Sequence, residues 1–509
     1  MSIMRGFFTV GFWTLVSRIL GFCRDIFIAG TLGATPVAEA FILAFSLPNL
    51  FRRFFAEGAF NMAFVPMFSK KLASGDSPVD FARDAISMLA FVLIVLNAIA
   101  MLAMPYLVWI MASGFAGDER FDLTVVFGRI AFPYILFISL AALVSGVLNS
   151  TGRFVASAAA PVLLNICFLS GLFIADWADW NIGLTLAWSV PVAGVAQFAF
   201  VWVAAHRVGF TLVPRLPRMT PELKRLAMIA APAALAGGVV QVNLVVGRQI
   251  ASYFDGANAW LYYADRLYQL PLGVVGIAIG IVLLPDLSRR LRLGDAEGGR
   301  EAFNRAAEFS LLLTIPSAVA LLVIPTALVS VLFERGEFGA NDTAATALAT
   351  AIYGLGLPAF VLQKLYQPLF FAREDTKSPF YFALVALSVN AAVAVGLSSF
   401  VGFTASAYGA TFAGWAMLAC LWWGSRKFGD AARLDAQLRH KSWRIVLASL
   451  MMGVAIWAAA QVMAPLLVVP GTRVLALIGV LAVGAFSYGL AGRIIGAFTL
   501  GELRRMMRS

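Results

Sequence analysis

Arginines and carboxylates occur inside the first two long apolar segments of this chain. The segment near residues 6–30 carries a hydroxyl, two arginines and an acid: Ser17, Arg18, Arg24 and Asp25. The segment near residues 38–68 carries a second polar set: Glu39, Asn49, Arg52, Arg53 and Glu57. A cation at the centre of a lone transmembrane helix costs about 2.5–3.5 kcal/mol on insertion scales. These side chains are therefore expected to face a wet cavity, a partner charge or an anionic ligand.

The guanidinium group is suited to binding phosphate. Its planar fork donates two parallel hydrogen bonds and keeps its charge in a dry site. Residues seven apart share a helical face, so Ser17 is expected over Arg24 and Arg18 over Asp25. Arginines from separate spans would together hold a di-anionic headgroup such as a pyrophosphate, and the acids would balance their charge in the empty site. Arg53 and Glu57 are an i,i+4 pair that would also serve as a structural ion pair.

The composition predicts a polytopic membrane protein. Of the 509 residues, 61% are hydrophobic and 13% are charged, whereas a soluble domain has about 25% charged residues. The N-terminus lacks a short apolar core followed by a cleavage site, so it is interpreted as the first transmembrane helix. The net charge is +11. Because the basic residues lie mostly in short loops, they indicate topology and anionic lipid headgroups rather than nucleic acid.

Cysteine and histidine are too sparse and too scattered to form a metal site, a disulfide framework or a Cys/His catalytic pair. The residues concerned are Cys23, Cys167, Cys420, His206 and His440. We therefore expect no metal and no cofactor. An enzyme acting on lipid-linked sugars would usually show clustered acids, a metal site or a histidine at a membrane face, so a transporter is favoured over an enzyme. Buried charges favour a gated carrier over a passive pore, while a scramblase-like activity stays open.

Fourteen segments approach or exceed the roughly 20 apolar residues that a spanning helix needs. They lie near residues 6–30, 38–68, 84–112, 122–148, 154–176, 182–205, 224–250, 257–286, 306–333, 343–371, 379–401, 404–425, 444–466 and 471–498. The longest must tilt or kink, and Pro48, Pro133 and Pro358 supply kink points. Alternate loops are rich in Lys and Arg, and the opposite loops hold only Arg120, Arg335 and Arg473. The positive-inside rule then places both termini in the cytoplasm.

The chain also repeats itself. Ala38-Glu39-Ala40-Phe41 corresponds to Ala257-Asn258-Ala259-Trp260, and Val65-Pro66 corresponds to Leu284-Pro285, both 219 residues later. Pro133 and Asn165 correspond to Pro358 and Asn390, 225 residues later. A six-span repeat keeps its orientation in the membrane and predicts two lobes with the substrate between them. We expect an N-terminal lobe over 1–210, a C-terminal lobe over 211–430, and two further spans within 431–509.

Three later spans add ionisable residues. Asp265 and Arg266 belong to the eighth span, Arg248 to the seventh and Lys364 to the tenth. Asp265 and Arg266 extend the charged set of the first two spans. Arg248 and Lys364 are interpreted as long side chains that reach outward to a membrane interface.

Specific motifs resemble a known family. Ser17-Arg18-x-x-Gly21-Phe22-x-Arg24-Asp25 is followed by Pro48-Asn49-x-x-Arg52-Arg53-x-x-Ala56-Glu57-Gly58-Ala59-Phe60, and later by Tyr263-Ala264-Asp265-Arg266-Leu267. These stretches are similar to the MurJ (MviN) family of lipid II flippases, within the MOP exporter superfamily. The resemblance extends over the whole chain, including the two extra C-terminal spans.

The resemblance implies a fold and a transport activity. The fold would be an all-α polytopic membrane protein of 14 transmembrane helices, with two six-helix lobes around a central cavity plus two C-terminal helices. It would move lipid II, an undecaprenyl-pyrophosphate-linked disaccharide-pentapeptide, from the inner to the outer leaflet by alternating access. Spans 13 and 14 would form a hydrophobic groove for the lipid tail.

By motif match, the resemblance also implies which residues act. Substrate-binding roles fall to Arg18, Arg24, Arg52, Arg266, Asn49 and Ser17. Roles in charge balance or coupling fall to Asp25, Glu39, Arg53, Glu57 and Asp265. The protein is expected in the bacterial cytoplasmic membrane as a monomer, with lipid II, membrane lipids and cell-wall synthesis proteins as partners.

Some positions depart from the family pattern. Residue 39 is Glu, where Asp is common, and residue 269 is Gln, where some relatives place Glu. The eleventh span carries no acid, so a sodium site is in doubt, and membrane potential or protons are the alternatives for coupling. Another exporter of the superfamily, for polysaccharide-lipids or drugs, is the alternative function. In the first two spans of this lobe arginines outnumber acids, which favours an anionic substrate.

Overall fold

The computed structural model describes residues 3–52, 59–278, 289–290, 293–373 and 375–498. Regular secondary structure in this part of the chain is helical, apart from one isolated bridge between Arg335 and Phe338. The chain divides into two compact units, Met1–Ala259 and Trp260–Ser509. Each unit is described by itself below.

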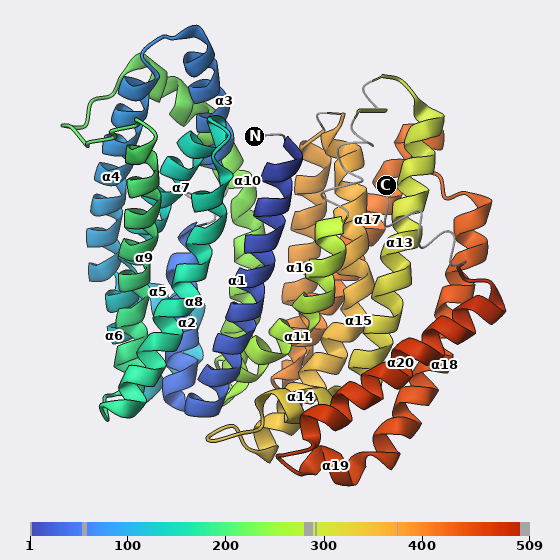
Figure 1. Ribbon diagram of the computed structural model, residues 1–509. Coiled ribbons are helices and arrows are strands. Elements are labelled where there is room, and N and C mark those ends of the chain that lie inside the picture. Colours follow the sequence, from blue (N-terminus) through green and yellow to red (C-terminus); the bar gives the residue numbers. More distant parts are fainter. Residues whose placement is uncertain (1–2, 53–58, 279–288, 291–292, 374, 499–509) are drawn as a thin grey trace. The chain divides into compact units, whose positions relative to one another are not determined.

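The first unit is built from ten α-helices and a short 3-10 turn among its described residues (Figure 1). They are α1 (Ile3–Leu32), α2 (Pro36–Arg52), α3 (Ala59–Ser74), α4 (Pro78–Leu102), α5 (Met104–Met111), η2 (Ser113–Phe115), α6 (Glu119–Ala131), α7 (Tyr134–Ser150), α8 (Phe154–Trp177), α9 (Ile182–Arg207) and α10 (Pro221–Ala251).

The helices of the second unit begin with α11, whose first residues belong to the first unit. They are α11 (Ala257–Ala278), α13 (Ala296–Val323), α14 (Pro325–Phe333), α15 (Ala340–Phe371), α16 (Lys377–Val401), α17 (Thr404–Ser425), η4 (Arg426–Ala432), α18 (Ala436–Val462), α19 (Ala464–Val468) and α20 (Arg473–Ile495).

Proline marks the points at which several predicted spans are interrupted. New helices begin at or beside Pro105, Pro133, Pro325 and Pro465, which lie at the starts of α5, α7, α14 and α19. Proline lacks a backbone N–H, so it is tolerated in the first turn of a helix but not inside one without loss of a hydrogen bond. Of the three expected kink points, Pro133 lies at such an interruption, whereas Pro48 and Pro358 lie within the continuous helices α2 and α15.

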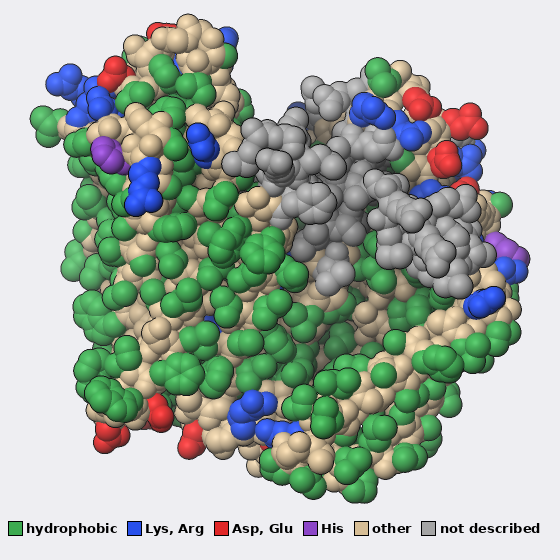
Figure 2. All heavy atoms as spheres, viewed as in Figure 1, with side chains coloured by type: hydrophobic (Ala, Val, Ile, Leu, Met, Phe, Trp, Pro, Cys, Tyr) green, Lys and Arg blue, Asp and Glu red, His purple; other side chains and the backbone are tan. Residues whose placement is uncertain are grey.

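The described helices confirm an all-α membrane fold. Nine helical segments among the described residues are long and apolar enough to cross a membrane. On the face of the first unit drawn in Figure 2, hydrophobic side chains cover the middle of the helices and charged side chains gather at the two ends. A lipid-facing belt requires this distribution. The full count of fourteen spans stays a prediction.

Helix pairing recurs in the two units as the sequence repeat predicts. In the first unit α8 packs on α9, and α7 also packs on α9. In the second unit the corresponding helices pair in the same way: α16 packs on α17, and α15 packs on α17. The additional helix α18 packs on α13 and α20. The division by packing falls after Ala259, later than the repeat-based lobe boundary after residue 210, which stays a prediction.

The loop before α6 is fastened to the end of α10. Backbone N–H groups of Ser113 and Gly114 donate to the side-chain oxygens of Gln249 and Ser252, each at 3.0 Å. Ser113 Oγ also lies 2.7 Å from the hydroxyl of Tyr253. These bonds hold the loop against α10. They also satisfy backbone N–H groups that the loop would otherwise leave unpaired.

Gly114→Ala tests this junction. A methyl group at Gly114 would lie 2.5 Å from the backbone carbonyl carbon of Ser252, so the loop would have to move and its hydrogen bonds to α10 would weaken. We expect a loss of roughly 1–3 kcal/mol of stability, the usual range for overpacking. The thermal unfolding midpoint of the purified protein in detergent measures it. Gly247→Ala on α10 is the control, since nothing lies within 4 Å of the added methyl group. Equal unfolding midpoints for the two variants would contradict a stabilising role of the contact between this loop and α10.

Candidate functional site

Arg24 is the most enclosed of the predicted substrate-binding arginines in the described residues. It lies on α1 with 7% of its surface exposed. Its Nε and Nη2 donate to Asp25 Oδ1 at 3.0 and 2.7 Å, and its Nη1 donates to Asn165 Oδ1 at 3.1 Å. The guanidinium carbon lies 5.3 Å from the ring centroid of Phe168. Asp25 therefore balances the charge of Arg24, while α8 fixes its direction.

Asn165 joins Ser17 to Arg24. Its Nδ2 donates to the backbone carbonyl of Ser17 at 2.9 Å and lies 3.5 Å from Ser17 Oγ. Two residues seven apart on α1 thus meet one side chain of α8, in keeping with their shared helical face. In the sequence, Asn165 is recognisable only as a marker of the repeat. A buried amide in an otherwise apolar span, 4% exposed here, is the signal that identifies it as a member of the site.

The structure does not bring every predicted residue into this network. Arg18 is exposed and forms no hydrogen bond or ion pair with another described residue. Asn49 donates to the carbonyl of Phe45 at 2.9 Å, within its own helix. Arg52 is half-buried in the last turn of α2, where the helix dipole favours a cation. Arg53 and Glu57 lie outside the described residues.

Glu39 has a distant partner that the sequence did not indicate. It is 1% exposed at the start of α2. Its Oε2 accepts from Arg120 Nη1 at 3.1 Å and from the backbone N–H of Gly256 at 3.0 Å. Its Oε1 accepts from the N–H of Asn258 at 3.0 Å. The repeat makes residues 39 and 258 equivalent, so the two repeat positions are themselves in contact.

The guanidinium of Arg120 forms ion pairs with three carboxylates. Besides Glu39, its Nη2 lies 2.6 Å from Asp118 Oδ2 and 2.9 Å from Asp255 Oδ1. Its guanidinium carbon lies 4.6 Å from the centroid of Phe115. Asp118 also caps α6 by accepting from the N–H of Arg120 at 2.8 Å. One buried cation thereby holds together the beginnings of α2 and α6 and the loop that follows α10.

The second unit holds Asp265 and Arg266 on α11. The guanidinium carbon of Arg266 lies 4.4 Å from the ring centroid of Tyr262, one turn earlier. Gln269 donates to Asp265 one turn later. Both charged side chains are half-buried.

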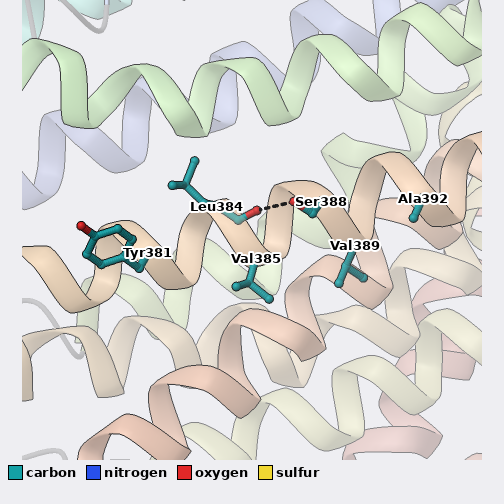
Figure 3. A pocket seen from close by; sticks show the side chains of 6 residues that line it. All are labelled: Tyr381, Leu384, Val385, Ser388, Val389 and Ala392. Carbon is teal, nitrogen blue, oxygen red and sulfur yellow. Dashed lines mark hydrogen bonds between the residues drawn. The ribbon is translucent and has the colours of Figure 1, made fainter.

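A hollow over one face of α16 offers no comparable chemistry. Figure 3 shows its lining, which consists of Tyr381, Leu384, Val385, Ser388, Val389 and Ala392. The hydroxyl of Ser388 donates to the carbonyl of Leu384 at 3.0 Å, within the helix. This surface suits hydrocarbon and contains no guanidinium or carboxylate to recognise a charged group.

Arg120→Leu tests the buried ion pair. It leaves Glu39 buried without its cation, and breaking a buried pair from one side costs about 3–5 kcal/mol. We expect a lower thermal unfolding midpoint in detergent and partial recovery in the double variant Arg120→Leu with Glu39→Gln. Arg129→Leu is the control, because Arg129 is an exposed arginine on the same helix. If Arg129→Leu lowered the midpoint as far, or if the double variant were less stable than Arg120→Leu, the pair would not have this role.

Comparison with known proteins gives consistent matches. A family model described as lipid II flippase MurJ matches residues 28–476. A probable lipid II flippase MurJ of Rhizobium tropici is 44% identical, covering 100% of this chain and 97% of the relative. The lipid II flippase MurJ of Burkholderia cenocepacia is 37% identical, covering 79% of this chain and 78% of the relative.

Solved structures share the fold. A lipid II flippase MurJ in an inward closed conformation matches with a TM-score of 0.80 and 24% identity, covering 95% of this chain and 98% of the other. An inward-facing multidrug resistance MATE family transporter of the MOP superfamily matches with a TM-score of 0.70 and 14% identity, covering 82% and 96%. At these sequence identities the structural matches show the fold alone. The extent of the family match and the identity to the curated relatives show that this multi-pass membrane protein belongs to the lipid II flippase MurJ family.

Proposed function

We propose that this chain is a lipid II flippase. It moves an undecaprenyl-pyrophosphate-linked disaccharide-pentapeptide from the cytoplasmic to the periplasmic leaflet of the bacterial inner membrane by alternating access. Membership of the family supports this activity over export of drugs or polysaccharide-lipids, which the shared MOP fold alone would allow. The activity is transport and involves no catalytic residue.

The observation that carries the proposal is the buried, oriented guanidinium of Arg24. Its charge is balanced by Asp25 and its direction is set by Asn165. A pyrophosphate is a stronger multidentate acceptor than a single carboxylate, and a guanidinium fork matches its geometry. The substrate would replace part of the contact between Arg24 and Asp25. Arg18, Arg52 and Arg266, with Asn49 and Ser17, are the further substrate-binding residues in this proposal.

Glu39 is the acid best supported for coupling. It lies in an apolar helix, yet it accepts hydrogen bonds from one guanidinium and two backbone N–H groups. These contacts tie the start of α2 to the residues after α10, and an alternating-access cycle needs contacts that form in one state and break in another. Loss of the negative charge on Glu39 would weaken all three bonds together. Asp25 and Asp265, with Arg53 and Glu57, balance charge in the same scheme.

The same proposal includes the orientation of the protein in the membrane, its oligomeric state and its partners. Both termini lie in the cytoplasm, since the loops between alternate spans differ strongly in Lys and Arg content. The protein works as a monomer among membrane lipids, next to the cell-wall synthesis proteins that consume its product. Spans 13 and 14 carry the lipid tail.

Substitutions of Arg24 test the substrate site. Arg24→Ala is expected to lower the rate of lipid II translocation in proteoliposomes about tenfold or more, because charge-assisted hydrogen bonds contribute about 1.5–3 kcal/mol. Arg24→Lys should fall between wild type and Arg24→Ala, since it keeps the charge without the fork. Arg153→Ala is the control, because Arg153 is an exposed arginine just before α8. Wild-type translocation by correctly inserted Arg24→Ala would remove Arg24 from the proposed site.

Depletion of the protein in its source bacterium tests the substrate. Lipid II should accumulate on the cytoplasmic leaflet, because synthesis continues while translocation stops. The measurement is the fraction of lipid II accessible from the periplasm. Accumulation of a different export substrate, with normal lipid II distribution, would favour the alternative exporter.

A further inference from the structure

Arg129 is an arginine inside a predicted span that none of the sites described above uses. It belongs to the fourth predicted span, 122–148, and lies on α6 with an exposed side chain. Charged residues within membrane spans almost always face a protein interior or a wet cavity and pair with another group. An exposed arginine at this place therefore calls for a partner outside its own chain.

The contact that Arg129 makes within the chain is explained by Pro105. Proline has no backbone N–H, so Pro105 leaves the carbonyl of Met101, four residues earlier, without its helical donor. Arg129 Nε donates to this carbonyl at 3.1 Å, which holds the guanidinium at the break between α4 and α5. In the part of the chain that the structure describes, Arg129 forms no other hydrogen bond and no ion pair, so its charge is unbalanced there.

Two helices place this guanidinium well below the headgroup layer. Arg129 lies ten residues after Glu119, where α6 begins, and Met101 lies ten residues before Met111, where α5 ends. Ten residues rise about 15 Å along an α-helix, which is half of the roughly 30 Å hydrocarbon core. Because Nε is fixed at the Met101 carbonyl, a lipid phosphate would have to leave the headgroup layer to reach it. A carboxylate on a second membrane helix can lie at this depth without such a displacement.

Exposed apolar and aromatic side chains surround the break. Leu102 and Tyr106 are 81% and 74% exposed, and Trp109 is exposed one turn further along α5. Val126, one turn before Arg129 on α6, is exposed as well. Helices α4 and α6 lie along one side of the first unit (Figure 1). Aromatic residues and arginine are the residue types enriched at protein interfaces, so this face has the composition of a contact surface.

The repeat supplies an internal comparison for this position. Residue 129 corresponds to Gly354, at the offset of 225 residues found for other repeat positions. A methyl group on Gly354 would lie 3.0 Å from Cβ of Leu321, which is four residues before Pro325. The second unit therefore fills the equivalent place, beside its own proline break, by close packing. One half of the repeat thus forms without a cation here, which indicates that the charge of Arg129 acts outside the fold.

We propose that the exposed face around Arg129 binds a transmembrane helix of another protein, and that this helix carries a carboxylate near the middle of the bilayer. The carboxylate forms a bidentate ion pair with the guanidinium, and Leu102 and Tyr106 pack against apolar side chains of the partner helix. The two charges balance each other away from water, whereas each alone is unfavourable there. The site shares no residue with the proposed substrate set, so it does not depend on the proposed function.

Binding of a synthetic transmembrane helix to the full-length protein tests the proposal. The probe is a helix of about 20 leucine and alanine residues with one central glutamate, and its control has glutamine at that position. Energy transfer from dye-labelled protein measures both affinities in phosphatidylcholine bilayers, at a mildly alkaline pH that favours the ionised carboxylate. We expect the glutamate helix to bind about tenfold more tightly, which corresponds to about 1.4 kcal/mol.

Variants of Arg129 show whether this preference comes from its charge. Arg129→Gln should abolish the preference, and Arg129→Lys should keep part of it, since lysine retains the charge without the fork. Arg129→Glu should instead prefer a helix with a central lysine, a reversal that a general loss of folding cannot produce. Arg153→Gln removes an exposed arginine just before α8 and should leave the preference for the glutamate helix unchanged.

Three results would overturn the proposal. The first is equal affinity of wild type for the glutamate and glutamine helices. The second is an unchanged preference for the glutamate helix in Arg129→Gln. The third is loss of the wild-type preference when phosphatidylglycerol is added to the bilayer at constant ionic strength, which would mean that a lipid phosphate occupies the guanidinium.

Discussion

The proposed function depends on keeping a guanidinium charged inside a helix contact that is otherwise apolar. Desolvation of a lone cation is unfavourable by several kcal/mol. Arg24 avoids much of that loss by donating twice to Asp25 and once to Asn165. The same three bonds fix the direction of its fork before any ligand arrives. A site arranged in advance loses less entropy on binding. The bonds that offset the desolvation of Arg24 therefore also favour binding of the substrate.

Arg120 is also buried in the first unit, but its contacts hold segments of the fold together. Arg120 contacts three carboxylates, and its bonds join segments that are far apart in the sequence. Among the partners given by the described residues, Arg24 contacts the carboxylate of Asp25 and the amide of Asn165, and an anion with more charge could replace them. Arg120 has an excess of acids, which an anion cannot replace.

Much of the fold could be predicted from the sequence, because a membrane limits the chain to long apolar helices. Most predicted segments overlap described helices, and prolines account for the interruptions at α5, α7, α14 and α19. The site could be predicted only where its partners are local, as for Ser17 and Arg24. Helical periodicity carries no information about contacts between spans, so the roles of Asn165 and Arg120 were missed.

The most direct test of the central claim is the distance between the Arg24 guanidinium and the phosphorus atoms of bound substrate. Solid-state NMR can measure it as a dipolar coupling between ¹⁵N-labelled arginine side chains and the ³¹P of lipid II, in wild type and in Arg24→Lys. We expect a coupling typical of hydrogen-bonded contact in wild type and a reduced coupling in the variant. An identical coupling in both proteins, with lipid II bound equally, would contradict it.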